Sequence, residues 1–180
     1  QDAPGNKSVP SRIDEILFVG PRKVTTVQKQ VGLQPHEILI QAECSLISTG
    51  TELKIFQGRF EDAALDVNIA GMEEGRMAYP LAYGYSLVGR VVECGHETDG
   101  KLLGKRVFTF APHASQVVTT PNAVQLVPDD VKSLDAIFMP SVETALSIVQ
   151  DARPVLGENV AVFGQGLIGL LVTALLRRHQ

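Results

Sequence analysis

The sequence has 180 residues, the length of one ordinary domain or of one domain and part of a second. Hydrophobic residues make up 44% and charged residues 20%, which is typical of a folded globular chain and excludes the disordered and fibrous classes. The net charge of −4 argues against nucleic acid as a partner, because surfaces that follow phosphates usually carry a basic excess.

The two cysteines, Cys44 and Cys94, cannot build a disulfide framework, and their spacing does not match a closed four-ligand zinc site. This favours a reducing intracellular compartment, cytoplasmic or organellar. Gln1 stands where an initiator Met would be, which is compatible with removal of a plastid transit peptide or with excision from a longer product. The apolar stretch 160–176 is too short and too rich in glycine for a membrane-spanning helix, so no transmembrane span is expected.

Residues 1–12 are expected to form a flexible arm, because most of them are polar. From residue 13 onward, apolar and β-branched runs alternate with turns that contain Gly or Pro, which is the pattern of short strands in a barrel or sandwich. Between the third and fourth strands lies a loop long enough to suggest a functional or mobile role. The expected strands cover 13–19, 23–30, 37–44, 86–94, 106–110, 116–119 and 123–127.

After the last of these strands the pattern changes from β to α. Two helices are expected, capped by Ser133 and Ser141 and separated by Pro140. The final segment predicts a buried strand at 159–163, then a tight turn and a helix at 170–178. The predicted fold class is therefore mixed β then α/β, a β-barrel domain followed by the first strand and helix of an incomplete Rossmann-type domain.

The turn after residue 163 has the pattern GxGxxG between a predicted strand and a predicted helix, which is the setting of a dinucleotide-binding turn. Gly164 permits the tight turn, Gly166 lets the backbone approach a pyrophosphate, and Gly169 lets helix and strand pack closely. The helix start also offers N–H groups and a positive dipole to phosphates. The predicted cofactor-binding residues are Gly164, Gly166, Leu167, Ile168 and Gly169.

The alternative for this turn is a glycine-rich strand-to-helix connection that binds nothing. The cofactor would be NAD or NADP, and the sequence does not indicate which of the two. The carboxylate that holds the ribose lies about 20 residues past the glycines, whereas the sequence given ends at Gln180.

Besides the glycine turn, the sequence contains three further motifs: LISTGTE at 46–52, YPLAYGYSLVGRVV at 79–92 and ETAL at 143–146. With the order of the elements, they resemble the medium-chain dehydrogenase/reductase superfamily, and the resemblance is nearest to the branch that includes bacteriochlorophyllide a dehydrogenase. It implies a GroES-like β-barrel domain at 13–128, a helical connection at 129–157 and the start of a nucleotide-binding domain at 158–180.

In zinc-dependent members of this family, a Cys and a Gly-His-Glu motif supply zinc ligands. This chain has Ser48-Thr49 and Gly84-Tyr85-Ser86 in those places, and hydroxyls are poor zinc ligands, so no zinc is expected. By resemblance, the catalytic candidates are the hydroxyls that would polarise a substrate carbonyl. They are Ser48, Thr49, Thr51 and Tyr85. Their structural alternatives are a turn and helix cap for the first three and barrel packing for Tyr85.

Other polar residues have structural interpretations. Cys94 and His96 could share one face of an extended strand, but a thiol at a strand end more often packs as a small hydrophobe, so no metal site is expected. His113 is expected to be a loop residue with a hydrogen-bonding role and not an acid or base. Glu52 would lie in a first helical turn, where the helix dipole stabilises a carboxylate.

Two functions remain open from the sequence. The first is a zinc-independent NAD(P)-dependent oxidoreductase acting on a carbonyl or hydroxyl of a small-molecule substrate, of which this chain is the N-terminal part. The second is a non-catalytic structural or assembly subunit of a larger complex, with a photosynthetic complex as one option, which would contact residues 158–180. If the chain truly ends at Gln180, we expect it to be inactive.

Overall fold

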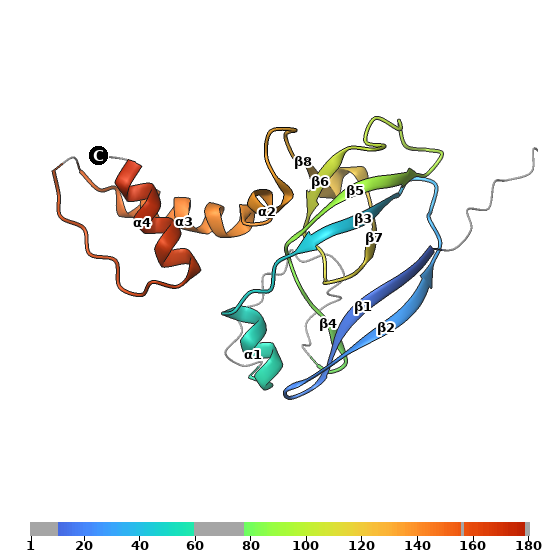
Figure 1. Ribbon diagram of the computed structural model, residues 1–180, viewed down its shortest axis with the longest axis horizontal. Helices are drawn as coiled ribbons and strands as arrows, with labels where there is room; N and C mark the ends of the chain where they lie inside the picture. The colour runs from blue at the N-terminus through green and yellow to red at the C-terminus, as the bar shows by residue number, and fades with distance from the viewer. Residues whose placement is uncertain (1–10, 60–77, 156, 179–180) are drawn as a thin grey trace, which may run out of the picture. The chain divides into compact units, whose positions relative to one another are not determined.

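The computed structural model describes residues 11–59, 78–155 and 157–178. These residues form two compact units that divide between Ile137 and Phe138. All the described strands belong to the first unit, and the two longest helices belong to the second (Figure 1). None of the helices in the described part of the chain has the length and apolar character that a membrane crossing requires.

The first unit begins with an antiparallel hairpin of β1 (Ser11–Gly20) and β2 (Lys23–Val31), in which Phe18 pairs with Val24 and Ser11 with Val31. The turn uses Pro21 and Arg22, and Arg22 adopts a positive φ of 59°. A short strand, β4 (Leu81–Ala82), pairs with the other edge of β1 and completes a three-stranded sheet. The hairpin predicted from the sequence is confirmed.

A second sheet of five antiparallel strands has the order β7-β3-β5-β6-β8. Strand β3, which lies between β7 and β5, begins with three apolar residues, as expected for a strand with neighbours on both sides. The five predicted strands agree with these elements to within about two residues. In chain order they are β3 (Ile38–Ser45), β5 (Leu87–Cys94), β6 (Arg106–Thr109), β7 (Gln116–Thr119) and, after a 3-10 turn at Pro121–Ala123, β8 (Val124–Leu126).

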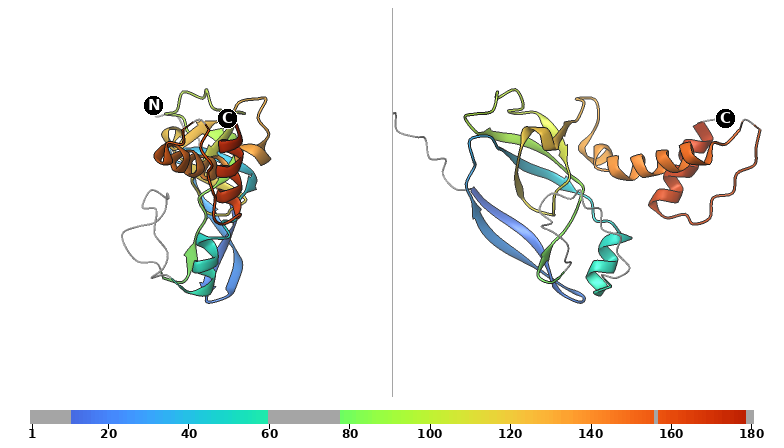
Figure 2. Two further views of the ribbon diagram at one scale, coloured as in Figure 1. Left: turned by 90° about the vertical axis from the view of Figure 1, so that its left-hand side faces the viewer. Right: turned by 180° about the vertical axis from the view of Figure 1, so that it is seen from behind.

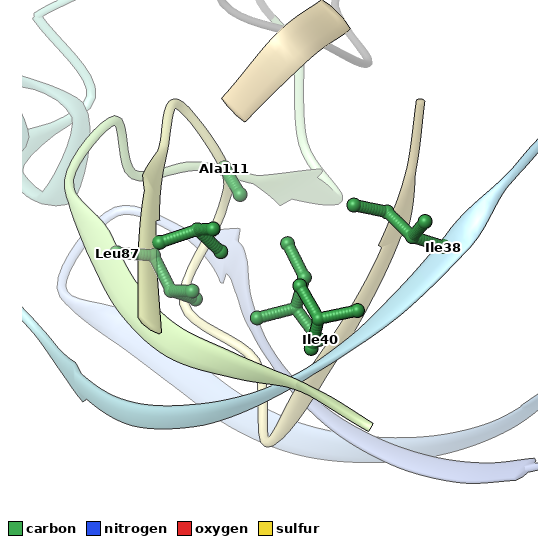
Figure 3. Close-up of a cluster of buried hydrophobic side chains, with 6 residues drawn as sticks. Ile38, Ile40, Leu87 and Ala111 are labelled. Carbon is green, nitrogen blue, oxygen red and sulfur yellow. The ribbon is translucent and has the colours of Figure 1, made fainter. Parts of the chain in front are cut away.

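The main apolar core lies on one face of the five-stranded sheet. Figure 3 shows Ile38 and Ile40 from β3 and Leu87 from β5 pointing into one shared interior. These three side chains have no exposed surface. Burial of this kind contributes roughly 1.5–3 kcal/mol for each large apolar side chain. The remaining buried members of the cluster are Val91, Val107 and Ala111.

Backbone hydrogen bonds between β1 and residues 113–115 join the two sheets. Ile16 N donates to His113 O at 3.0 Å, and Ser115 N donates to Asp14 O at 2.8 Å. Helix α1 (Thr51–Gln57) lies near β1, and its Ile55 packs in a second apolar cluster with Phe18 and Tyr83. The connection at 113–115 therefore holds His113 where the two sheets meet.

The helices begin at different residues from those expected. Lys132, and not Ser133, is the N-cap of the short α2 (Ser133–Ala136), which ends the first unit. In the second unit, α3 (Met139–Ala152) follows a Phe138 cap and has Pro140 in its first turn. Proline is tolerated there because the first N–H groups of a helix have no partner within it. The expectations that Pro140 interrupts a helix and that Ser141 caps one were therefore wrong.

The second unit consists of α3 and α4 (Leu167–Arg178), which pack against each other; Figure 2 shows the pair in two further views. The strand predicted at 159–163 is not formed, so this prediction was wrong. Val160 is 51% exposed and Phe163 is 95% exposed. A parallel strand needs neighbouring strands for its hydrogen bonds and its burial, and the described residues of the second unit provide none.

Candidate functional site

The segment that leads into α1 is held by the backbone and side chain of Ser48. Glu52 N donates to Ser48 O at 3.0 Å, and Thr51 N donates to Ser48 Oγ at 3.4 Å. In return, Ser48 N donates to Glu52 Oε1 at 2.8 Å. These reciprocal bonds fix the turn before α1, whose N-cap residue is Gly50 and makes no side-chain cap bond. Among the predicted hydroxyl residues, the structure brings Ser48 and Thr51 together, while Thr49 lies exposed in the turn.

The second carboxylate oxygen of Glu52 reaches a histidine from a distant part of the chain. Glu52 Oε2 lies 2.8 Å from His113 Nε2, and the other ring nitrogen, Nδ1, lies 2.8 Å from Ser45 Oγ. Glu52 is 2% exposed and His113 is 3% exposed, whereas Ser45 is exposed at the end of β3. Ser45, His113 and Glu52 therefore form a hydrogen-bonded chain from a buried carboxylate to an exposed hydroxyl.

Gly84 packs directly against this histidine. Its φ is +142°, and a Cβ at this position would lie 3.1 Å from His113 Nε2 and 3.0 Å from His113 N. The His113 N–H donates to Tyr83 O at 3.3 Å. Only glycine fits this close approach without moving the ring. The segment 83–85, which includes one of the predicted site residues, thus fixes the histidine.

Tyr85 lies in a mainly apolar setting. It is half-buried and packs against the cluster of Phe18, Ile55 and Tyr83, and its ring meets that of Tyr83 edge-to-face with 6.4 Å between centroids. The neighbouring Ser86 is buried and donates its hydroxyl hydrogen to Ile137 O. The packing expected as the alternative for Tyr85 is therefore present.

The residues that the resemblance places at the zinc-ligand positions carry hydroxyl groups, which are poor zinc ligands. Ser48, Thr49 and Tyr85 offer hydroxyls in place of thiolate and imidazole. The described residues contain no group of three or more His, Cys, Asp or Glu side chains that could hold a metal ion. Cys94 packs against the main core and His96 is exposed, so the structure does not bring these two residues together in one site.

Cys44 also has the properties of a structural thiol. Its Sγ lies 3.6 Å from Ser133 O. Burial, with a smaller contribution from the negative charge of Glu43, raises the pKa of the Cys44 thiol. A raised pKa disfavours the thiolate that a metal ion or an electrophile requires.

The glycine turn lies in the second unit, before α4. Gly164 has a φ of +89°, and a Cβ on Gly169 would lie only 1.9 Å from Gly164 O, so both positions require glycine for the turn itself. At Gly166, by contrast, a Cβ would have nothing within 4 Å. The backbone bond from Leu170 N to Gly166 O, 2.9 Å long, starts the helix. The preceding N–H groups, of Leu167, Ile168 and Gly169, are those that a helix start leaves for other partners.

Sequence reasoning considered His113 and Glu52 separately and did not predict their pairing. It did not identify Ser45 at all. The hydrogen-bonding role expected for His113 is observed, but the partners come from β3 and α1, 68 and 61 residues away along the chain. The available signals were the polar residues in the otherwise apolar stretch APHAS and the serine that ends β3.

No model of a protein family matches the sequence, and a search of curated proteins finds no match. Solved structures do match. The chain aligns with a short chain alcohol dehydrogenase of E. coli CFT073 in complex with NADH, at 16% identity and a TM-score of 0.73 over 93% of this chain and 53% of the other. It aligns with 2R,3R-butanediol dehydrogenase of Bacillus subtilis at 17% identity and a TM-score of 0.72, over 92% and 55%.

A third match is CAD of Helicobacter pylori in complex with NADP(H), at 14% identity and a TM-score of 0.69 over 94% and 57% of the two chains. The chain thus spans about half the length of the structures it matches. Identities this low show the fold alone. The predicted fold class, a β domain followed by the start of an α/β domain, is confirmed, apart from the strand at 159–163, which is not formed. Over the part it spans, the chain has the fold of the dehydrogenase structures that it matches.

Proposed function

We propose that this chain is the N-terminal part of an NAD(P)-dependent oxidoreductase of the medium-chain dehydrogenase/reductase type, which works without zinc on a carbonyl or hydroxyl group. The fold supports the general kind of protein, and one matched structure contains NADH and another NADP(H). The motifs at 46–52 and 79–92 support a place near the bacteriochlorophyllide a dehydrogenase branch. We do not transfer the tetrapyrrole substrate of that branch, because substrates depend on individual pocket residues.

The observation that carries this proposal is the difference between Gly166 and its two neighbours in the motif. Gly164 and Gly169 are required by the turn itself, through a positive φ and a close contact. Gly166 has an ordinary φ and open space around it, so the folded chain itself does not require glycine there. A glycine at this place is explained if a pyrophosphate approaches the backbone.

The residues of the first unit would supply the polar contacts to the substrate. A bound nicotinamide would supply or accept hydride. Ser48 Oγ accepts a hydrogen bond from Thr51 N, and a hydroxyl that accepts in this way can still donate its own hydrogen to a carbonyl oxygen. Without a metal ion, such hydroxyls would polarise the carbonyl.

A cofactor titration of the full-length protein tests the proposal. NADH and NADPH fluorescence should change saturably on binding. Gly166→Asp adds a negative charge at the helix start while providing a good N-cap, so binding should weaken by about tenfold or more with the helix intact. Gly32→Asp is the matched control, because Gly32 also has nothing within 4 Å of its Cβ position. Titrations without a response to either cofactor would contradict the proposal.

The second candidate, a non-catalytic subunit of a larger complex, is favoured by one observation. Apolar side chains of the second unit are exposed, including Val160, Phe163 and Leu170. In a subunit of this kind, a partner protein would cover residues 158–180. The mass of the protein isolated from its natural source separates the candidates. A value near 19.4 kDa favours the subunit, and about 35 kDa or more, enough for a complete nucleotide-binding domain, favours the oxidoreductase.

A further inference from the structure

The hydrogen-bonded chain of Ser45, His113 and Glu52 has the composition of a proton relay. The buried Glu52 carboxylate can only accept hydrogen bonds, so its contact with His113 Nε2 assigns a hydrogen to that nitrogen. His113 Nδ1 then exchanges a proton with Ser45 Oγ, 2.8 Å away. Only the last member, Ser45, is exposed. The network therefore connects a buried carboxylate group to an exposed serine residue.

The imidazole is held in place from several sides. His113 N donates to Tyr83 O, and His113 O accepts from Ile16 N. Gly84 would contact the ring if it carried a Cβ. The Glu52 carboxylate is fixed in turn by the backbone N–H of Ser48. A base and its orienting carboxylate that are fixed before the reaction lose little freedom during it.

The charges of this network suit transfer of one proton. The neutral ring accepts the Ser45 hydrogen bond at Nδ1, and the protonated ring donates at both nitrogens. Glu52 Oε2, 2.8 Å from Nε2, can accept a hydrogen bond from the ring in both of these forms and so orients it, as a carboxylate does in other hydroxyl–imidazole systems. Other acidic residues nearby are Asp14 and Glu15 of β1, whose backbone pairs with the segment 113–115.

We propose that Ser45 is a catalytic residue that transfers the proton in the proposed carbonyl reduction, and that His113, oriented by Glu52, supplies it. A bound reduced nicotinamide would supply the hydride for the carbonyl carbon, and Ser45 Oγ gives its hydrogen to the carbonyl oxygen. Ser45 then takes the hydrogen of Nδ1 from protonated His113. The ring keeps its hydrogen bond to Glu52 and regains a proton from water through Ser45; oxidation of an alcohol runs the same steps in reverse.

This proposal rests on the proposed function for its substrate, but the relay can be tested without cofactor. A hydroxyl that His113 can deprotonate should attack the activated ester p-nitrophenyl acetate. The ester bond to nitrophenolate breaks, an acetyl–Oγ bond forms, and His113 takes the proton. Acetylation is followed by peptide mass, with Ser147, an exposed serine of α3, as internal reference.

In the unmodified full-length protein, Ser45 should be acetylated about tenfold faster than Ser147 or more. In His113→Gln and Glu52→Gln the rate at Ser45 should fall toward that of Ser147. Equal labelling of the two serines in the unmodified protein would overturn the relay. This comparison uses only the unmodified protein, so it does not depend on whether a variant folds.

Turnover tests whether the relay serves the reaction. With NADPH and the carbonyl probe 9,10-phenanthrenequinone, Ser45→Ala should lower kcat by about tenfold or more, with KM changed by less than about twofold. Ser147→Ala should match the unmodified protein. Full turnover in Ser45→Ala would overturn the role of Ser45 even if labelling succeeds. Titrations that show no binding of NADH or NADPH would instead contradict the proposed function, and the labelling result would still decide the relay.

Discussion

The two units of this protein differ in whether their structure depends on distant or on local contacts. In the first unit, polar groups such as Glu52 and His113 are buried and hydrogen-bonded to residues far away in the chain, and apolar side chains form a buried core. In the second unit, the glycine turn is built from six consecutive residues, and large apolar side chains such as Phe163 remain exposed. A local motif such as this turn can therefore keep its geometry even where the sheet expected around it is not formed.

The largest effect should come from the core of the first unit. Ile40→Ala removes a side chain without exposed surface and should lower the free energy of unfolding by about 2–5 kcal/mol, because a cavity is left. Tyrosine fluorescence during urea unfolding measures this unit specifically, since the three tyrosines, Tyr79, Tyr83 and Tyr85, all belong to it. Leu103→Ala, at an exposed position, is the control and should change little.

Within the second unit, substitutions at Gly169 and Gly166 should differ in their effect on stability, because the two glycines differ in their packing. A Cβ on Gly169 would lie 1.9 Å from Gly164 O, so Gly169→Ala must displace the turn and should cost about 1–3 kcal/mol. Gly166→Asp should leave stability nearly unchanged because nothing surrounds that position. Helical circular dichroism during thermal unfolding compares the two variants. Equal losses would mean that the fold requires glycine at 166 as it does at 169, and a pyrophosphate would not be needed to explain Gly166.

A smaller effect is expected at the buried Glu52. In Glu52→Gln, one oxygen can still accept from Ser48 N or from His113, but the amide NH₂ replaces the other acceptor. The free energy of unfolding should fall by about 1–2 kcal/mol. Glu37→Gln is the control, because the Glu37 carboxylate accepts from Gln34 N at an exposed site. A loss no larger than that of the control would show that the buried network contributes little to stability.

The sequence predicted most of the first unit because its signals are local. Strands such as 37–44 follow from apolar runs between turn residues, and the structure contains β3 at nearly the same positions. The strand predicted at 159–163 fails for the complementary reason. Its apolar residues are the right kind for a parallel strand, but formation depends on neighbouring strands that the described residues do not supply.

The same difference applies to the candidate site. The shape of the turn at 164–169 was predictable, because glycine spacing and a following helix are local features. The pairing of Glu52 with His113 was not, because it joins residues 61 positions apart and depends on how β1 meets the segment 113–115. The serine that ends β3 was visible in the sequence, but a role for Ser45 follows only from its contact with His113.

The smallest effect should come from the most exposed apolar side chain. Phe163 is 95% exposed, so Phe163→Ala should change the free energy of unfolding by no more than about 0.5 kcal/mol, measured by circular dichroism. The same substitution should also be measured in the protein isolated from its natural source. A loss well above 1 kcal/mol there, together with a change in molecular mass on gel filtration, would mean that another surface covers Phe163 in solution. The second unit would then be stabilised by contacts with a partner protein, and this result would favour the subunit role over the oxidoreductase.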